Sequence, residues 1–199
     1  ADLRLYLRWQ KERTLVSRLY AGWGVPYGNS TTLPFVKQFY SGGPYSVRAF
    51  DIRSIGPGNF LPDTDDDTTD YYDQSGNLKL EANVEYRFPL FSYLKGAFFV
   101  DAGNVWLTGD YSSLIEDEST STSSVSLFTD GKFEKDWLSE VAAGVGFGVR
   151  LDIQSFVIRL DLASPLRIPY LDENERWNVP FFGNADNNMT LNFAIGYPF

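Results

Sequence analysis

The 199-residue sequence contains neither cysteine nor histidine. Without cysteine, the chain cannot form a disulfide or a thiolate-based metal or redox site. Without histidine, it lacks the usual general base and the commonest metal ligand, so a Ser-His-Asp triad within it is excluded. The acidic run at 63–67 lacks the ligand spacing of a calcium-binding EF-hand loop. We therefore expect no metal, no cofactor and no enzymatic activity.

Basic residues and long apolar runs are scarce as well. The 17 lysines and arginines are outnumbered by 26 acidic residues, which gives a net charge of −9. Binding to nucleic acid through a basic patch is therefore not expected. No run of 18 apolar residues is present, so the sequence predicts no transmembrane helix. The chain starts at Ala1 rather than at Met and has no signal peptide, which predicts a fragment or a processed mature chain.

What the sequence does contain is a regular alternation of apolar and polar residues. Between 78 and 88, one face carries Leu78, Leu80, Ala82, Val84, Tyr86 and Phe88, and the other carries Lys79, Glu81, Asn83, Glu85 and Arg87. A period of two is typical of a β-strand, and no helix would sort these residues. The pattern predicts seven strands, at 2–10, 14–26, 78–89, 93–106, 139–152, 155–165 and 189–199. Glycines on one face of 142–148 would let a loop or plug approach the sheet closely.

The predicted strands have the lengths and connections of an outer-membrane barrel. Most are about ten residues or longer, as a tilted strand needs to be to cross a bilayer. Short turns at 11–13, 90–92 and 153–154 alternate with long loops at 27–77, 107–138 and 166–188. Aromatic residues make up 17% of the chain, which is typical of a barrel with aromatic girdles. A soluble β-sandwich or a lipocalin-like barrel is the alternative, but these features favour an all-β fold, an antiparallel transmembrane β-barrel.

Seven strands do not close such a barrel, because its strand number is even and open edges are not tolerated in lipid. We therefore expect further strands upstream of Ala1, with residues 1–199 forming the C-terminal portion of the barrel. The acidic and serine-rich segment at 107–138 is expected to be a solvated extracellular loop. Trp106, Trp137 and Trp177 fall near predicted strand ends and are expected to anchor the barrel at the membrane interface.

The loop at 27–77 carries the most distinctive motifs. Gly42-Gly43-Pro44 and Gly56-Pro57-Gly58 predict tight turns. Between them, Val47-Arg48-Ala49-Phe50 places one arginine among apolar residues. A buried arginine requires a carboxylate partner, so this loop predicts an ion pair with another part of the chain.

These motifs resemble those of the BamA/TamA superfamily of outer-membrane assembly factors, also called bacterial surface antigens. The family's Val-Arg-Gly-Phe/Tyr motif corresponds to Val47-Arg48-Ala49-Phe50, preceded by Gly42 and Gly43, with Ala49 in place of the usual glycine. A Phe-x-Asp-x-Gly strand motif appears as Phe99-Val100-Asp101-Ala102-Gly103, and Glu85 matches a glutamate on the preceding strand. The closing strand resembles the family's C-terminal β-signal, with one alternating face formed by Leu191, Phe193, Ile195, Tyr197 and Phe199. The resemblance covers residues 14–199 approximately, and the motif sequences are closer to those of TamA-like proteins than to those of BamA.

The resemblance implies a sixteen-stranded barrel in the bacterial outer membrane, with the 27–77 loop folded into its lumen. It implies insertion of outer-membrane proteins, or translocation of surface proteins, through a weak seam beside the strand at 189–199. The implied partners are outer-membrane lipids, unfolded client proteins and periplasmic or accessory assembly subunits. A passive porin-like channel and an outer-membrane enzyme barrel with its catalytic residues upstream are the alternatives.

Alternation places Glu85 and Asp101 on the lumen side of neighbouring strands. Two such carboxylates can receive one guanidinium, which offers five donors in a fixed geometry. We therefore predict that Arg48 pairs with Asp101 and Glu85 and holds the loop inside the barrel. The alternative is generic pairing among the many charges that face the lumen.

Overall fold

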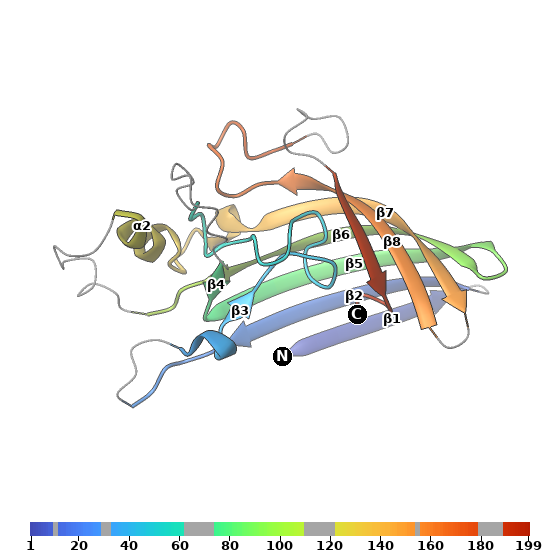
Figure 1. The fold of residues 1–199 in the computed structure, drawn as a ribbon, viewed down its shortest axis with the longest axis horizontal. Helices are drawn as coiled ribbons and strands as arrows, with labels where there is room; N and C mark the ends of the chain where they lie inside the picture. Colours follow the sequence, from blue (N-terminus) through green and yellow to red (C-terminus); the bar gives the residue numbers. More distant parts are fainter. Residues whose placement is uncertain (10–11, 29–32, 62–73, 110–121, 154–155, 179–188) are drawn as a thin grey trace.

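The computed structural model describes residues 1–9, 12–28, 33–61, 74–109, 122–153, 156–178 and 189–199. Seven strands form one curved sheet (Figure 1). They are β1 (Asp2–Trp9), β2 (Arg13–Trp23), β5 (Leu78–Phe91), β6 (Leu94–Trp106), β7 (Ala142–Ile153), β8 (Phe156–Arg167) and β9 (Thr190–Ile195). Each pairs antiparallel with the next, so all seven predicted strands are present and form an open meander.

The long connections contain only short elements. These are η1 (Phe35–Lys37), β3 (Phe39–Tyr40), β4 (Ser75–Gly76), α2 (Thr122–Asp130) and η2 (Trp137–Glu140). The predicted strand at 139–152 therefore begins late, at Ala142, because η2 occupies its first residues. Among the described residues, no helix is both long enough and apolar enough to span a membrane.

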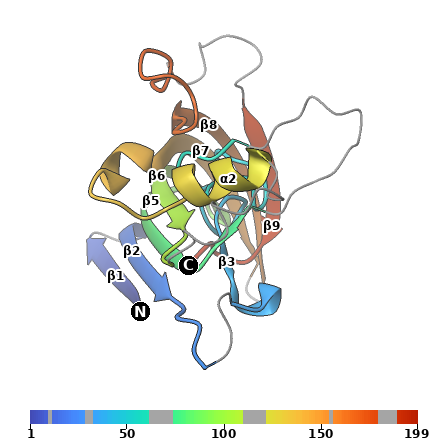
Figure 2. The same cartoon turned by 90° about the vertical axis from the view of Figure 1, so that its left-hand side faces the viewer.

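The alternating pattern separates the two faces of the sheet as expected. On β5, Glu81, Asn83, Glu85 and Arg87 are buried, whereas Val84 between them is exposed. Seen end-on, the sheet curls around the described part of the long loop, which lies on its concave side (Figure 2). The polar face is thus buried by the loop, because charged side chains can be enclosed only where partners satisfy them.

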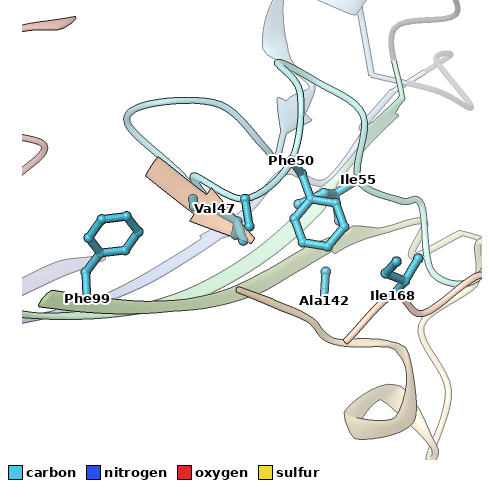
Figure 3. Packing of buried hydrophobic residues seen from close by; sticks show 8 residues of the cluster. Val47, Phe50, Ile55, Phe99, Ala142 and Ile168 are labelled. Carbon is cyan, nitrogen blue, oxygen red and sulfur yellow. The ribbon is translucent and has the colours of Figure 1, made fainter. Parts of the chain in front are cut away.

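A small apolar cluster joins the loop to the sheet. Its buried members are Val47, Ala49, Phe50, Ile55, Phe99, Ala142, Ala163 and Ile168. In Figure 3 the loop side chains Val47, Phe50 and Ile55 lie over residues that belong to the sheet and its ends. The core of the described molecule is therefore the contact between loop and sheet, not the contact between two sheets.

Three glycines of β7 make room for this contact. A Cβ atom at Gly144 would overlap the Cβ of Ala49, and one at Gly146 would overlap the ring of Phe99. At Gly148 it would meet the side chains of Asp161 and Arg150. The glycine face predicted for this strand therefore lets the loop tip, an aromatic ring and an ion pair approach the backbone.

The predicted strand at 189–199 is wrong in its second half. Strand β9 ends at Ile195, because Gly196 adopts a φ of +94°, a conformation that L side chains rarely adopt. Leu191, Phe193 and Ile195 stay on the outer face at 70%, 63% and 62% exposure. Phe199 is instead turned inward and is only 7% exposed, so the five residues do not share one face. Alternation alone could not reveal a turn that depends on one positive φ angle.

We predict that Gly144→Ala lowers the free energy of unfolding of the full-length protein by about 1–3 kcal/mol, the usual effect of overpacking a filled core. The added methyl group would overlap Ala49. The double variant Ala49→Gly/Gly144→Ala moves the methyl group across the contact and should recover most of the loss. Urea unfolding in detergent micelles measures both. Equal losses in the single and double variants would contradict this packing.

Candidate functional site

The centre of the buried polar face is the side chain of Arg48, which has no solvent exposure. Its Nε donates to Oδ2 of Asp101 at 2.7 Å and its Nη2 donates to Oδ1 at 2.9 Å. Nη1 donates to Oε2 of Glu85 at 2.5 Å. The guanidinium also lies over the ring of Phe99, 3.5 Å from its centroid. The structure therefore brings together the three residues for which the sequence predicted an ion pair.

The pairing of β5 with β6 creates this receptor. Asn83 lies directly opposite Asp101, and Glu85 lies opposite Phe99. Both carboxylates are buried on the concave face. Asn83 donates to Oδ1 of Asp101 and to the carbonyl of Ser46, at 3.0 Å each, so it links the receptor to the loop directly.

The ion pair belongs to a larger buried network. Arg150 on β7 contacts Glu85 at 3.1 Å and donates to Asp161 on β8. Arg159 lies 3.1 Å from Asp161, and Arg87 lies 2.7 Å from Glu85. Including Arg48 and Asp101, four arginines here contact three carboxylates. Removing one member of such a network leaves an uncompensated charge without water, which is strongly destabilising.

The electrostatic balance at Arg48 favours the charged guanidinium. Burial opposes the charge, but the carboxylates of Asp101, Glu85 and Asp161 outweigh that effect and raise the pKa of Arg48 above its usual value. Arg48 therefore stays charged at any pH that the folded protein tolerates.

Gly42 and Gly43 shape the loop around this arginine. Both have positive φ angles, of +100° and +94°, and a Cβ atom at Gly42 would overlap the carbonyl oxygen of Asp51. The amide of Gly43 donates to the carbonyl of Phe50 at 3.0 Å, which closes the tip. Ala49 is buried at this tip and is not among the residues with positive φ. Alanine therefore fits where the resembling family usually has glycine.

The loop also contacts the last strand, which the sequence reasoning did not foresee. Asn192 donates to the carbonyl of Arg48 at 2.8 Å, and Thr190 donates to the carbonyl of Ala49 at 3.2 Å. The hydroxyl of Tyr45 donates to the carbonyl of Ile195 at 2.8 Å. Alternation did place Thr190 and Asn192 opposite the apolar face of that strand, and this was the available signal.

The final residues contact the same network. The guanidinium of Arg87 lies 4.2 Å from the ring centroid of Tyr197, and that of Arg48 lies 5.8 Å from the centroid of Phe199. Tyr197 also donates to Asp152 at 3.3 Å. These two residues were predicted to continue an outward face, and the turn at Gly196 gives them arginine partners inside instead.

A second polar contact binds the loop to the sheet further along the chain, at Gly58. Asn104 on β6 donates to the carbonyl of Gly58 at 2.8 Å and also to the carbonyl of Glu140. Trp106 has no solvent exposure, and its Nε1 donates to Oε2 of Glu140. The expectation that Trp106 anchors the membrane interface is therefore wrong, since its ring packs edge-on against Phe133 inside the connection.

Some predicted features lie outside the described residues, namely the acidic run at 63–67 and most of the acidic and serine-rich part of 107–138. Within the ranges that the structure describes, no three acidic side chains gather as a metal site would require.

Comparisons with known proteins point to one family. The Omp85 superfamily domain matches residues 1–199. Outer membrane protein assembly factor BamA of Neisseria meningitidis serogroup B is 31% identical over 85 residues, which covers 40% of this chain and 10% of that protein. A crystal structure of BamA from Haemophilus ducreyi lacking POTRA domains 1–3 superposes with a TM-score of 0.63 at 18% identity, and this supports the fold. The match covers 98% of this chain and 34% of that one, so the chain spans about a third of the neighbour's length.

We predict that Asp101→Asn lowers the free energy of unfolding by about 3–5 kcal/mol, because it leaves Arg48 buried with one carboxylate partner fewer. The matched control is Asp152→Asn, which removes a carboxylate paired with Lys95 in a partly exposed position. That change should cost about 0–1 kcal/mol. Urea unfolding of the full-length protein compares the two, and similar small losses would show that Arg48 does not depend on Asp101.

Glu140 should give the protein a measurable pH dependence. Burial raises the pKa of Glu140 above its ordinary value of 4.5, and the bond from Trp106 offsets only part of the shift. The folded state thus binds this proton more firmly than the unfolded state, so the contribution of Glu140 to stability falls as the pH rises through its raised pKa.

Glu140→Gln keeps an acceptor for Trp106 and removes this titration. We expect the variant to be more stable than the wild type at neutral pH, with the difference shrinking towards pH 4. Unfolding curves across that range measure it, with the exposed Glu173→Gln as the control. A difference that does not change with pH would contradict the assignment.

Proposed function

This chain belongs to the Omp85 superfamily, and from that membership we propose that its barrel inserts other proteins into the bacterial outer membrane or translocates them across it. Superfamily members are outer-membrane β-barrel proteins of bacteria, and the relative from Neisseria meningitidis is named as an assembly factor. The proposed partners are membrane lipids, unfolded client proteins and periplasmic or accessory subunits.

The observation that carries the proposal is the edge formed by β9. In the described sheet β9 pairs with β8 alone, as β1 at the opposite end pairs with β2 alone. The side of β9 away from β8, its open edge in the described sheet, is therefore where a further strand pairs, either another strand of the barrel or a strand of a client. Strand β9 contains six residues, whereas β8 contains twelve. A last strand this short leaves half the length of β8 uncovered and makes few bonds to any neighbour, so an extended client segment can pair with its edge through backbone hydrogen bonds.

The outer and inner faces of β9 suit different neighbours. Leu191, Phe193 and Ile195 point outward and can contact acyl chains. Thr190 and Asn192 point inward and bond to the loop. A client strand added at this edge would therefore meet lipid on one side and the anchored loop on the other, which is the environment of a strand entering a barrel.

The same structure supports the alternative function, a passive channel, less well. The described part of the loop lies on the concave side of the sheet and is anchored there by buried ion pairs. A loop fixed in this way obstructs a pore, whereas a channel requires an open one. A channel would nevertheless conduct ions without any client, so conductance of planar bilayers separates the two functions.

We predict that Phe193→Pro slows client insertion about tenfold, which corresponds to roughly 1.4 kcal/mol. The backbone of Phe193 faces the open side of β9, so proline removes an edge donor without breaking a bond to β8. Phe193→Ala keeps the donor and should insert clients at nearly the wild-type rate. The assay follows folding of a urea-denatured outer-membrane barrel into liposomes that contain the full-length protein.

The assay has a clear adverse outcome. If Phe193→Pro inserts the client as fast as Phe193→Ala, the edge of β9 takes no part in assembly. If the wild-type protein conducts ions but does not accelerate insertion over empty liposomes, the passive channel is the correct function.

A further inference from the structure

Tyr45 makes an unusual contact for a loop side chain. Its hydroxyl donates to a backbone carbonyl of the last strand, that of Ile195, at 2.8 Å. Both residues are more than half exposed, Tyr45 at 51% and Ile195 at 62%. This contact therefore lies at the margin of the described sheet, in contrast to the fully buried ion pairs of Arg48.

The direction of the Ile195 carbonyl follows from the register of β8 and β9. Ile195 lies opposite Ile158, and the amide of Gly196 donates to the carbonyl of Val157 at 2.7 Å. In an antiparallel pair, residues that bond across the ladder alternate with residues whose backbone groups point away from it. Because Gly196 bonds to β8, the backbone of Ile195 points to the open edge. Tyr45 therefore occupies an acceptor at the place where another strand would pair.

A second residue holds the tyrosine in this position. Arg159 on β8 donates to the carbonyl of Pro44 at 2.8 Å, and its guanidinium lies 5.0 Å from the ring centroid of Tyr45. Arg159 itself is buried and contacts Asp161. The ring is thus supported from the ionic network, while its hydroxyl extends to the exposed edge.

We propose that Tyr45 caps the open edge of β9 and competes with an incoming client strand for the carbonyl of Ile195. This inference rests on the proposed pairing of clients at that edge. When no strand pairs with Ile195, the hydroxyl satisfies the acceptor and restrains the end of β9. When a client strand pairs there, its backbone N–H replaces the hydroxyl, and Arg48 keeps the rest of the loop in place.

The cap can first be tested without any client. Tyr45→Phe removes only the hydroxyl and keeps the ring over Arg159. Tyr40→Phe is the matched control, because the Tyr40 hydroxyl donates to Phe35 within the same loop. Hydrogen–deuterium exchange of residues 190–196 in the full-length protein should be about fivefold faster in Tyr45→Phe alone, as expected for losing one net hydrogen bond. Equal exchange in both variants would overturn the cap.

Competition is tested with a defined strand. The probe is a fluorescent peptide with the sequence of residues 189–199, titrated into the same proteins in liposomes and followed by anisotropy. Tyr45→Phe should bind it about fivefold more tightly than the wild type and Tyr40→Phe. Faster exchange with unchanged peptide affinity would overturn the competition. Faster exchange with no peptide binding to any variant would leave the contact standing and count against strand pairing at β9, and hence against the proposed function.

Discussion

A single guanidinium without access to water dictates much of this molecule. Arg48 enters a space enclosed by the sheet and remains charged there, so carboxylates must be fixed at the positions that its donors reach. Asp101 and Glu85 meet that requirement because β5 and β6 pair in the register that sets them diagonally across from each other on the concave face. The ring of Phe99 covers the flat side of the guanidinium, and Gly146 gives that ring its place. Side chains on three strands, β5, β6 and β7, thus meet the requirements of one buried cation.

The loop around Arg48 connects the neighbouring strands β5, β6 and β7 to β9, which pairs with none of them. It bonds to β5 and β6 through ion pairs, to β7 by packing against Gly144, and to β9 through Asn192 and Thr190. These contacts differ in strength, because buried charge pairs with no exposure resist breaking far more than single hydrogen bonds near solvent. The loop is therefore bound more strongly to β5 and β6 than to β9. The proposed function requires both properties, because β9 must accept a client strand while the loop stays in place.

The sequence predicted most of the fold because period-two alternation is a strong signal over long strands. It placed all seven strands and put Arg48, Glu85 and Asp101 on one side of the sheet. It could not predict the end of β9, since one glycine angle decides whether Tyr197 and Phe199 face out or in. It also misplaced Trp106, because position near a strand end does not tell whether a folded connection covers the ring. Contacts such as Tyr45 to Ile195 join segments 150 residues apart and depend on three-dimensional placement that no local pattern contains.

The shortness of β9 limits how firmly anything can be held there. Within β9, only Leu191, Phe193 and Ile195 direct backbone groups away from β8, so an added strand gains at most six hydrogen bonds. At about 1 kcal/mol net for each bond, their sum corresponds to a dissociation constant between roughly millimolar and micromolar. A strand bound with this affinity dissociates quickly and leaves the edge of β9 free to bind another. Under the proposed function, the six-residue length of this strand therefore favours repeated turnover over permanent capture.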